Sequence, residues 1–213
     1  MKEIDRSFIL KDLKLLKGNK SEKSVYKLTL FNKDVRLDIF QFQYTWYLIH
    51  NFAYENKINV AREIFITEEY GIVYRICDFI NGSFIDKADD VKDAYIKSGE
   101  QIAKLNSVKP SEELMNKVGL KGGDINDYGL TNSDFSSPNA IYDKNKNVYL
   151  IDTDSFKVKK ISNGELDFTL VKPLVKWIKN REKINYFLEG YSKYRDPTNI
   201  IKLCESFNWQ WII

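Results

Sequence analysis

The segment 140–151 constrains the fold of this chain more than any other, because its pattern is typical of a β-hairpin. Two short apolar runs flank the polar residues 143–147, and runs of this kind pair across such a turn. Asn139 stands directly before the first run and Asp152 directly after the second. Antiparallel pairing therefore brings these two side chains to the same edge of the hairpin.

A second carboxylate precedes the hairpin. Asp134 lies five residues before Asn139, and Pro138 stiffens the loop between them. Magnesium-dependent phosphoryl transfer needs one carboxylate to orient the attacking hydroxyl and further oxygen ligands for the metal ions that neutralise the phosphates. We therefore expect Asp134 to be the catalytic residue, and Asn139, Asp152 and Asp154 to be metal ligands.

Two other interpretations of these residues stay open. Clusters of Asp, Asn, Ser and Pro are also typical of plain turns, so Asp134 and Asn139 taken alone can be turn formers. Asp152-Thr-Asp154 after an apolar strand is also how many sugar-nucleotide glycosyltransferases hold a divalent metal. That alternative leaves Asp134 and Asn139 unexplained.

With two further segments, the pattern resembles the kinase-like fold, in the branch of aminoglycoside phosphotransferases, choline kinases and lipopolysaccharide-core sugar kinases. In that branch an Asp is followed five residues later by an Asn, and then by an apolar strand ending in Ile-Asp, as at Ile151-Asp152. Residues 73–82 resemble the strand and hinge between the lobes. Residues 99–108 resemble the helix before the catalytic loop, with Asn106 where the family usually has His.

The resemblance implies an α+β, bilobal, protein-kinase-like fold. Residues 1–80 would form an N-lobe of antiparallel sheet and one helix, and residues 81–213 a minimal, mostly helical C-lobe with the catalytic loop and the metal-binding hairpin. It also implies ATP and Mg²⁺ as cofactors, with Asp78, Phe79 and Ile80 in the hinge that binds ATP. The implied reaction moves the γ-phosphate to a hydroxyl of a protein or a sugar-type acceptor.

The third strand departs from the family, which usually has a phosphate-binding Lys there. Asp38 occupies the Lys position, and Arg36 lies one pleat away on the same face. Residues 21–27 resemble the second strand of the with-no-lysine kinases, which implies Lys23 as the relocated cation. Lys27 shares its strand face and is the second candidate. Both lysines are also compatible with an ordinary edge strand.

The catalytic loop departs from the family as well. Asn132 stands where a His is usual, and Ser136 replaces a second His. Asn132 can preserve a hydrogen bond that orders the loop. The one His of the chain, His50, lies in a predicted helix and is expected to have an ordinary structural role. Two possibilities follow: a divergent active kinase, which the three retained site positions favour, or a catalytically silent pseudokinase that binds nucleotide or protein.

The sequence predicts alternating strands and helices on both sides of this loop. The expected strands and helices are strands 8–16, 24–30, 35–40, 65–66 and 72–79, helices 42–54 and 89–108, and further aromatic-rich helices within 164–213.

The composition of the chain bears on its binding partners and its cellular compartment. With 43% hydrophobic residues the chain can bury one core or two small lobes. The 33 basic and 30 acidic residues give a net charge of +3, which does not indicate a nucleic-acid partner. Two cysteines indicate a reducing compartment, and no apolar run predicts a membrane span. We expect a cytoplasmic bacterial protein that binds a nucleotide, with the acceptor left open.

Overall fold

The structure, a computed structural model, describes residues 14–18, 23–30, 32–41, 44–120 and 122–207. Contacts divide the chain into two compact units. The first unit comprises Met1–Gln43 and Ala61–Ile80, and the second comprises Tyr44–Val60 and Asn81–Ile213. Each unit is described by itself below.

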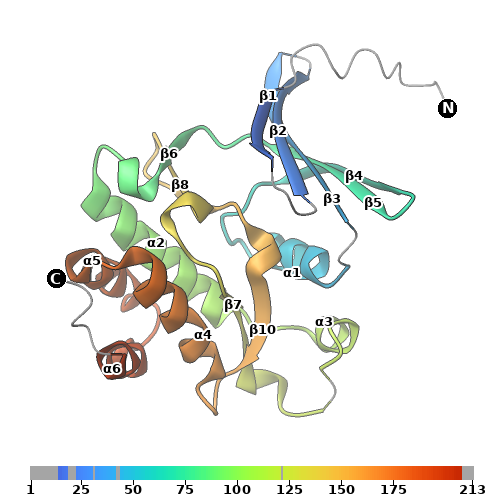
Figure 1. The fold of residues 1–213 in the computed structure, drawn as a ribbon. Helices are drawn as coiled ribbons and strands as arrows, with labels where there is room; N and C mark the ends of the chain where they lie inside the picture. Colours follow the sequence, from blue (N-terminus) through green and yellow to red (C-terminus); the bar gives the residue numbers. More distant parts are fainter. Residues whose placement is uncertain (1–13, 19–22, 31, 42–43, 121, 208–213) are drawn as a thin grey trace. The chain divides into compact units, whose positions relative to one another are not determined.

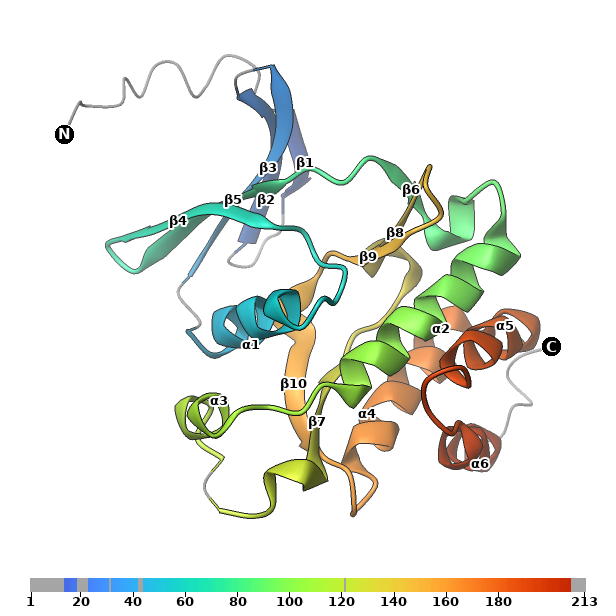
Figure 2. The same cartoon turned by 180° about the vertical axis from the view of Figure 1, so that it is seen from behind.

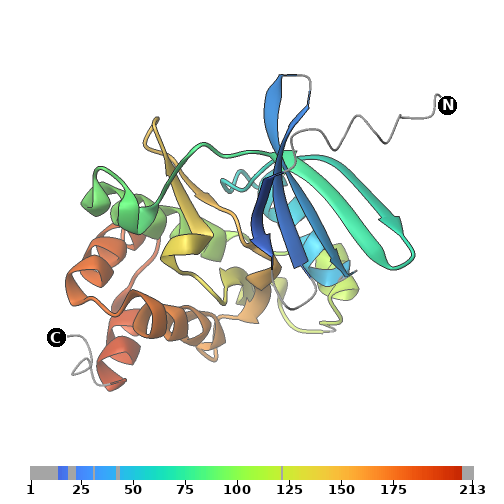
Figure 3. The same cartoon turned by 45° about the horizontal axis from the view of Figure 1, so that its top comes forward.

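The first unit is an antiparallel sheet of five strands in the order β1-β2-β3-β5-β4 (Figure 3). The strands are β1 (Lys14–Gly18), β2 (Lys23–Leu30), β3 (Lys33–Gln41), β4 (Glu63–Glu69) and β5 (Ile72–Asp78). Predicted strands 24–30 and 35–40 are confirmed as parts of β2 and β3. Of the predicted strand 8–16, residues 8–13 lie outside the described part.

Alternation along the strands gives the sheet two different faces. One face gathers a small apolar cluster around Leu28, Val35 and Leu37, which are buried. Between β4 and β5, Tyr70 and Gly71 both have positive φ, at 54° and 76°. Positive φ at both central residues is what a two-residue type I′ hairpin requires, so this turn fits the twist of the two strands.

The second unit contains helices and two small sheets (Figure 1). Its helices are α1 (Tyr44–Glu55), α2 (Val91–Ser107), α3 (Glu112–Lys117), α4 (Glu165–Pro173), α5 (Arg181–Tyr191) and α6 (Thr198–Ser206). Its strands are β6 (Gly82–Phe84), β7 (Tyr128–Asn132), β8 (Ala140–Asp143), β9 (Val148–Leu150) and β10 (Phe156–Lys160). Short turns are η2 (Ile85–Lys87), η3 (Ile125–Asp127), η4 (Ser137–Asn139), η5 (Thr153–Ser155) and the π-helical η6 (Leu174–Ile178).

Strand β7 pairs with β10, and β8 lies between β6 and β9, all antiparallel. The predicted helix 89–108 is confirmed as α2, and the predicted hairpin as β8 and β9. Among the described residues no helix is long and apolar enough to cross a membrane. Both cysteines, Cys77 and Cys204, are unpaired and buried, and burial raises the pKa of the Cys77 thiol to about 11.

Helices α2 and α5 lie side by side and approach at two glycines (Figure 2). A Cβ atom at Gly99 of α2 would lie 1.9 Å from the carbonyl oxygen of Phe187. A Cβ atom at Gly190 of α5 would lie 1.8 Å from the carbonyl oxygen of Ile96. Because no side chain other than hydrogen fits at either position, the backbones of the two helices touch.

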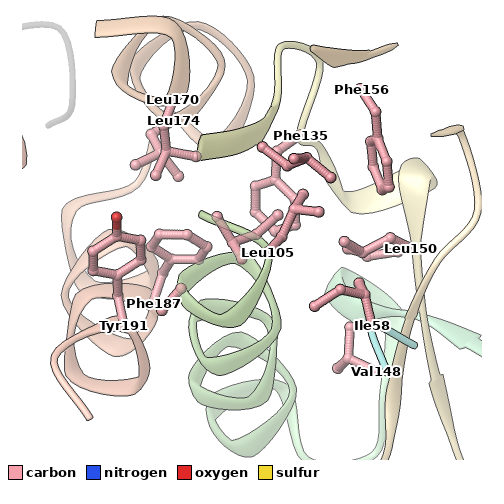
Figure 4. Packing of buried hydrophobic residues seen from close by; sticks show 14 of the residues in the cluster. Ile58, Leu105, Phe135, Val148, Leu150, Phe156, Leu170, Leu174, Phe187 and Tyr191 are labelled. Carbon is pink, nitrogen blue, oxygen red and sulfur yellow. The ribbon is translucent and has the colours of Figure 1, made fainter. Parts of the chain in front are cut away.

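This close helix pair supports the loop that follows β7. Phe135, the residue after Asp134, is fully buried and its ring lies 5.2 Å from that of Phe187 (Figure 4). The ring of Phe187 in turn stacks on Tyr191 at 6.1 Å. The main core of the second unit therefore reaches directly under the predicted catalytic loop.

Helix α1 belongs to the second unit, whereas the sequence analysis placed the helix 42–54 in the N-lobe. Its residues Ile49 and Ala53 belong to the large core of the second unit. The chain after α1 stays with this unit as well, because Val60 bridges Leu150 and the Leu150 N–H donates to the carbonyl of Asn59 at 2.9 Å. The contacts thus separate the units at residues 43, 60 and 80, whereas the sequence suggested a single boundary at 80.

Candidate active site

The loop between β7 and β8 is closed by a single amide. Asn139 Nδ2 donates to the carbonyl oxygen of Asp134 at 2.8 Å and lies 3.2 Å from the Asp134 carboxylate Oδ2. Asn139 is buried, whereas Asp134 is half-buried. The amide therefore fixes the carboxylate while part of that carboxylate stays accessible.

The hairpin brings the next acidic residues to the same place. The Ile151 N–H donates to the carbonyl oxygen of Asn139 at 3.0 Å, directly beyond the paired residues Ala140 and Leu150. Asp152 lies between Ile151 and the turn η5. Its backbone is therefore one residue away from Ile151, which bonds to Asn139. This geometry agrees with the sequence-based expectation that antiparallel pairing places Asn139 and Asp152 at one edge.

Turn η5 is held by a contact that the sequence did not predict. His50 of α1 and Thr153 are both buried, and His50 Nδ1 lies 2.9 Å from Thr153 Oγ1. Thr153 stands between Asp152 and Asp154, which are both half-buried. His50 thus contacts the candidate metal turn, although its place in a predicted helix indicated an ordinary structural role.

Asn139 and Asp152 carry oxygen atoms of the type that Mg²⁺ takes as ligands. Asn139 Nδ2 donates to Asp134, so the amide oxygen Oδ1 is the acceptor end of this side chain. Asp152 is half-buried, and the hairpin pairing brings its backbone close to that of Asn139. Within the described ranges, no group of three or more His, Cys, Asp or Glu side chains is placed to hold a metal by itself. Mg²⁺ is usually bound by one or two protein ligands together with phosphate oxygens and waters.

The Asn that replaces the usual His does order the loop. Asn132 Oδ1 accepts from the Asp134 N–H at 2.9 Å, and Ser155 Oγ lies 2.7 Å from the same oxygen. Asn132 is fully buried. The predicted ordering role of Asn132 is therefore observed.

In the first unit, the two candidate lysines of β2 have different surroundings. Lys27 Nζ lies 2.5 Å from Asp34 Oδ2 and 4.6 Å from the centre of the Phe79 ring. Lys23 begins β2 opposite Phe40, but its side chain lies outside what the structure describes. Lys27 is thus already paired within the sheet.

Asp38, at the usual Lys position of the third strand, is the centre of a buried ion group. Its side chain is fully buried, with Arg75 Nη2 at 2.5 Å from Oδ2 and Arg36 Nε at 2.7 Å from Oδ1. Arg75 lies directly opposite Asp38 on β5 and is 3% exposed. The sequence analysis missed Arg75, because only the strand register shows which β5 residue faces Asp38.

The predicted hinge begins where β5 ends. The Asp78 carboxylate accepts from Lys33 Nζ at 2.8 Å and from Arg62 Nε at 3.0 Å. Burial raises the pKa of this carboxyl, but the hydrogen bonds from Lys33 and Arg62 outweigh burial and leave the pKa below its ordinary value. Phe79 and Ile80 follow outside any strand and are half-buried. The Asp78 side chain therefore joins the end of β5 to the start of β3 and to the residue before β4.

The candidate residues fall into two groups. Asp134, Asn139 and the turn with Asp152 and Asp154 come together in the second unit, while the candidate ATP-binding residues belong to the first. These are Lys23, Lys27, Arg36, Asp78, Phe79 and Ile80.

Comparison with solved structures identifies this architecture. A spectinomycin phosphotransferase in complex with ADP and spectinomycin matches with a TM-score of 0.68 at 11% identity, over 94% of this chain and 80% of that one. The chain has the kinase-like fold. An ethanolamine kinase of Plasmodium vivax matches at a TM-score of 0.66 and 12% identity, over 94% and 73% of the two chains.

A macrolide 2′-phosphotransferase of Brachybacterium faecium shares the kinase-like fold too, with a TM-score of 0.62 and 12% identity over 92% of this chain and 82% of that one. No protein-family model and no curated sequence matches the chain. The predicted α+β kinase-like fold is confirmed.

Proposed function

We propose that this chain is an ATP- and magnesium-dependent phosphotransferase that moves the γ-phosphate to a hydroxyl group. The observation that carries the proposal is the arrangement of Asp134, Asn139 and Asp152 within a kinase-like fold. An accessible carboxylate is fixed by an amide, and that amide residue pairs beside a second carboxylate. Phosphoryl transfer depends mainly on positioning and electrostatics, which such an arrangement can supply.

Asp134 orients the acceptor hydroxyl and receives its proton. The hydroxyl oxygen forms a bond to the γ-phosphorus while the bond to the departing ADP oxygen breaks. The bond from Asn139 Nδ2 restricts the rotation of the Asp134 side chain, so less conformational freedom is lost when the acceptor binds. The half-buried position of Asp134 limits its exposure to water and leaves access for an acceptor.

Asn139 Oδ1 and the Asp152 carboxylate would hold Mg²⁺, with Asp154 as a second ligand or a turn former. When bound, the ion neutralises charge on the phosphate oxygens. In the first unit, Asp78, Phe79 and Ile80 are the proposed hinge that binds the adenine end of ATP. Lys23, Lys27 and Arg36 are the candidate cations for its phosphates.

For the acceptor, we favour a small molecule with a hydroxyl group over a protein. The solved structures with the same fold support this choice, since they include kinases of spectinomycin, ethanolamine and a macrolide. At 11 to 12% identity they support the class of acceptor and no particular compound.

One observation favours a second candidate function, a pseudokinase that binds nucleotide or protein without transfer. Asp38 occupies the place of the usual phosphate-binding Lys, and its buried carboxylate is neutralised by Arg36 and Arg75. If no cation elsewhere on the sheet replaces that Lys, the chain binds nucleotide and leaves the phosphate in place.

A transfer experiment separates the two functions. The purified chain is mixed with Mg²⁺, ATP labelled at its γ-phosphate and an extract of small metabolites, beside Asp134→Ala and the surface control Glu205→Gln. We expect label in an acceptor with the wild type and the control, and none with Asp134→Ala. Thermal stabilisation by ATP without any transfer would instead support the pseudokinase.

A further inference from the structure

Hydrogen bonds from two polar side chains connect the loop of Asp134 to the turn of Asp152. Ser155 Oγ lies 2.7 Å from Asn132 Oδ1 and 2.7 Å from the carbonyl oxygen of Asp152, so its single proton can be donated to either. The same Asn132 oxygen accepts the N–H of Asp134 at 2.9 Å. Asn132 and Ser155 therefore link the backbone of Asp134 to the backbone of Asp152, with the Ser155 proton shared between its two acceptors.

The neighbouring residue strengthens this connection. Ser133 donates twice to the carbonyl oxygen of Ser155, from its N–H at 3.1 Å and from its Oγ at 2.8 Å. Asn132 itself pairs with Phe156 at the end of the β7–β10 ladder. The loop after β7 and the turn before β10 are thus bonded to each other directly, where β7 ends and β10 begins.

We propose that Asn132 and Ser155 are positioning residues, which keep Asp134 and Asp152 in the fixed relation that phosphotransfer needs. The proposal rests on the proposed function, and it gives Asn132 a task beyond ordering its own loop. Neither residue has to touch ATP or the acceptor, since both act through the two aspartates.

The hydrogen bonding of the Asn132 side chain is incomplete. Its Nδ2 is buried and finds no partner in the part of the chain that the structure describes. A buried donor without an acceptor costs about 1–3 kcal/mol. The two bonds made by Oδ1 have to offset that cost, and both of them lead toward the candidate site.

Thr131 supplies a matched control on the same strand. Like Asn132 it is fully buried, and its Oγ1 has no partner among the described residues. Thr131→Val replaces this hydroxyl by a methyl group of nearly equal size. It therefore tests the effect of a change in the buried strand that leaves the bonds of Asn132 and Ser155 in place.

The experiment measures ADP formation from ATP and Mg²⁺, with the release of inorganic phosphate as the probe reaction. It uses Asn132→Ala, Ser155→Ala, the double variant, Ser155→Thr and Thr131→Val. For both single alanine variants we expect kcat to fall about tenfold to a hundredfold, the usual cost of losing an outer hydrogen-bonding partner, while the KM for ATP changes little. The double variant should be hardly slower than either single variant, because both interrupt one connection.

Conservative substitution supplies the second readout. Ser155→Thr keeps the hydroxyl and should recover most of the rate, and Thr131→Val should match the wild type. Should Asn132→Ala fail to fold, Ser155→Ala compared with Ser155→Thr tests the connection by itself.

Several results would overturn the inference. Wild-type kcat in Ser155→Ala, losses that multiply in the double variant, or an equal loss in Thr131→Val would each show that no positioning connection exists. If the wild type itself neither forms ADP nor is stabilised by ATP with Mg²⁺, the proposed function fails and the inference fails with it. An active wild type with unaffected variants rejects the inference alone.

Discussion

Asn139 uses the two ends of its amide for different tasks. Its nitrogen donates to Asp134, and its oxygen is the proposed metal ligand. Asp cannot replace it in both tasks, because an ionised carboxylate has no hydrogen to donate and would repel Asp134. An Asn at position 139 is therefore explained by its hydrogen bonds to Asp134.

Asp152, directly before η5, and Asp154 within it should differ in their importance as metal ligands. Asp152 lies beside the Asn139 pairing and is expected to be the principal carboxylate ligand, so Asp152→Ala should abolish the magnesium-dependent stabilisation by ATP. Asp154→Ala should reduce it less. Thermal unfolding with ATP, with and without Mg²⁺, measures both effects. An Asp152→Ala variant that gains as much stability from ATP with Mg²⁺ as the wild type would contradict this assignment.

At the scale of elements, the contact between α2 and α5 determines where the catalytic loop is supported. Gly99→Ala should destabilise the second unit by about 3 kcal/mol or more, because the new methyl group meets backbone that cannot move aside. Ser107→Ala, at the exposed last residue of the same helix, should change the free energy of unfolding little. Urea unfolding of both variants checks this. Equal midpoints would show that the helices can separate to admit a side chain.

Turn η2 introduces a pH dependence. Burial raises the pKa of the Asp86 carboxyl, but hydrogen bonds from Lys183 and Tyr95 outweigh burial and leave it below the ordinary value of 3.8. A lowered pKa in the folded state stabilises the fold above that ordinary value, and this stabilisation is lost as the pH falls through the folded pKa.

Asp86→Asn should therefore unfold more easily than the wild type at pH 7, with a difference that shrinks toward pH 3. Melting temperatures across this range measure the effect, and Asp124→Asn is an exposed carboxylate for comparison. A difference that stays constant with pH would mean that Asp86 contributes by shape and not by charge.

The elements that sequence predicted well are those whose pattern is local. The hairpin with Asn139 and Asp152 depends on alternation over a few residues, and the long helix α2 on its periodic apolar face. Sequence could not predict that His50 contacts Thr153, because 103 positions separate them. The pairing of Arg75 with Asp38 likewise depends on strand register, which propensities do not determine.

At the scale of the whole molecule, the proposed reaction depends on a cation that binds the phosphates of ATP. Arg36 shares the buried carboxylate of Asp38, and Lys27 is paired with Asp34. Both cations therefore have a partner that would compete with phosphate. Lys23, suggested by the resemblance to the with-no-lysine kinases, remains the first candidate.

Lys23→Ala should lower the rate of transfer about a hundredfold, since a cation near developing phosphate charge contributes a few kcal/mol. Lys27→Ala should have a milder effect, and Asp38→Lys should not restore the rate in Lys23→Ala. Single-turnover transfer of labelled phosphate gives the comparison. If Lys23→Ala transfers at the wild-type rate and Arg36→Ala does not, the third strand supplies the cation after all.

The chain has a single histidine, and that histidine contacts the turn between Asp152 and Asp154. Its imidazole therefore gives one set of histidine signals in an NMR spectrum, with no second histidine to be told apart from it. Any ion or nucleotide that rearranges η5 changes the surroundings of this ring. The native protein thus contains its own spectroscopic reporter, placed beside the residues that are proposed to bind the metal.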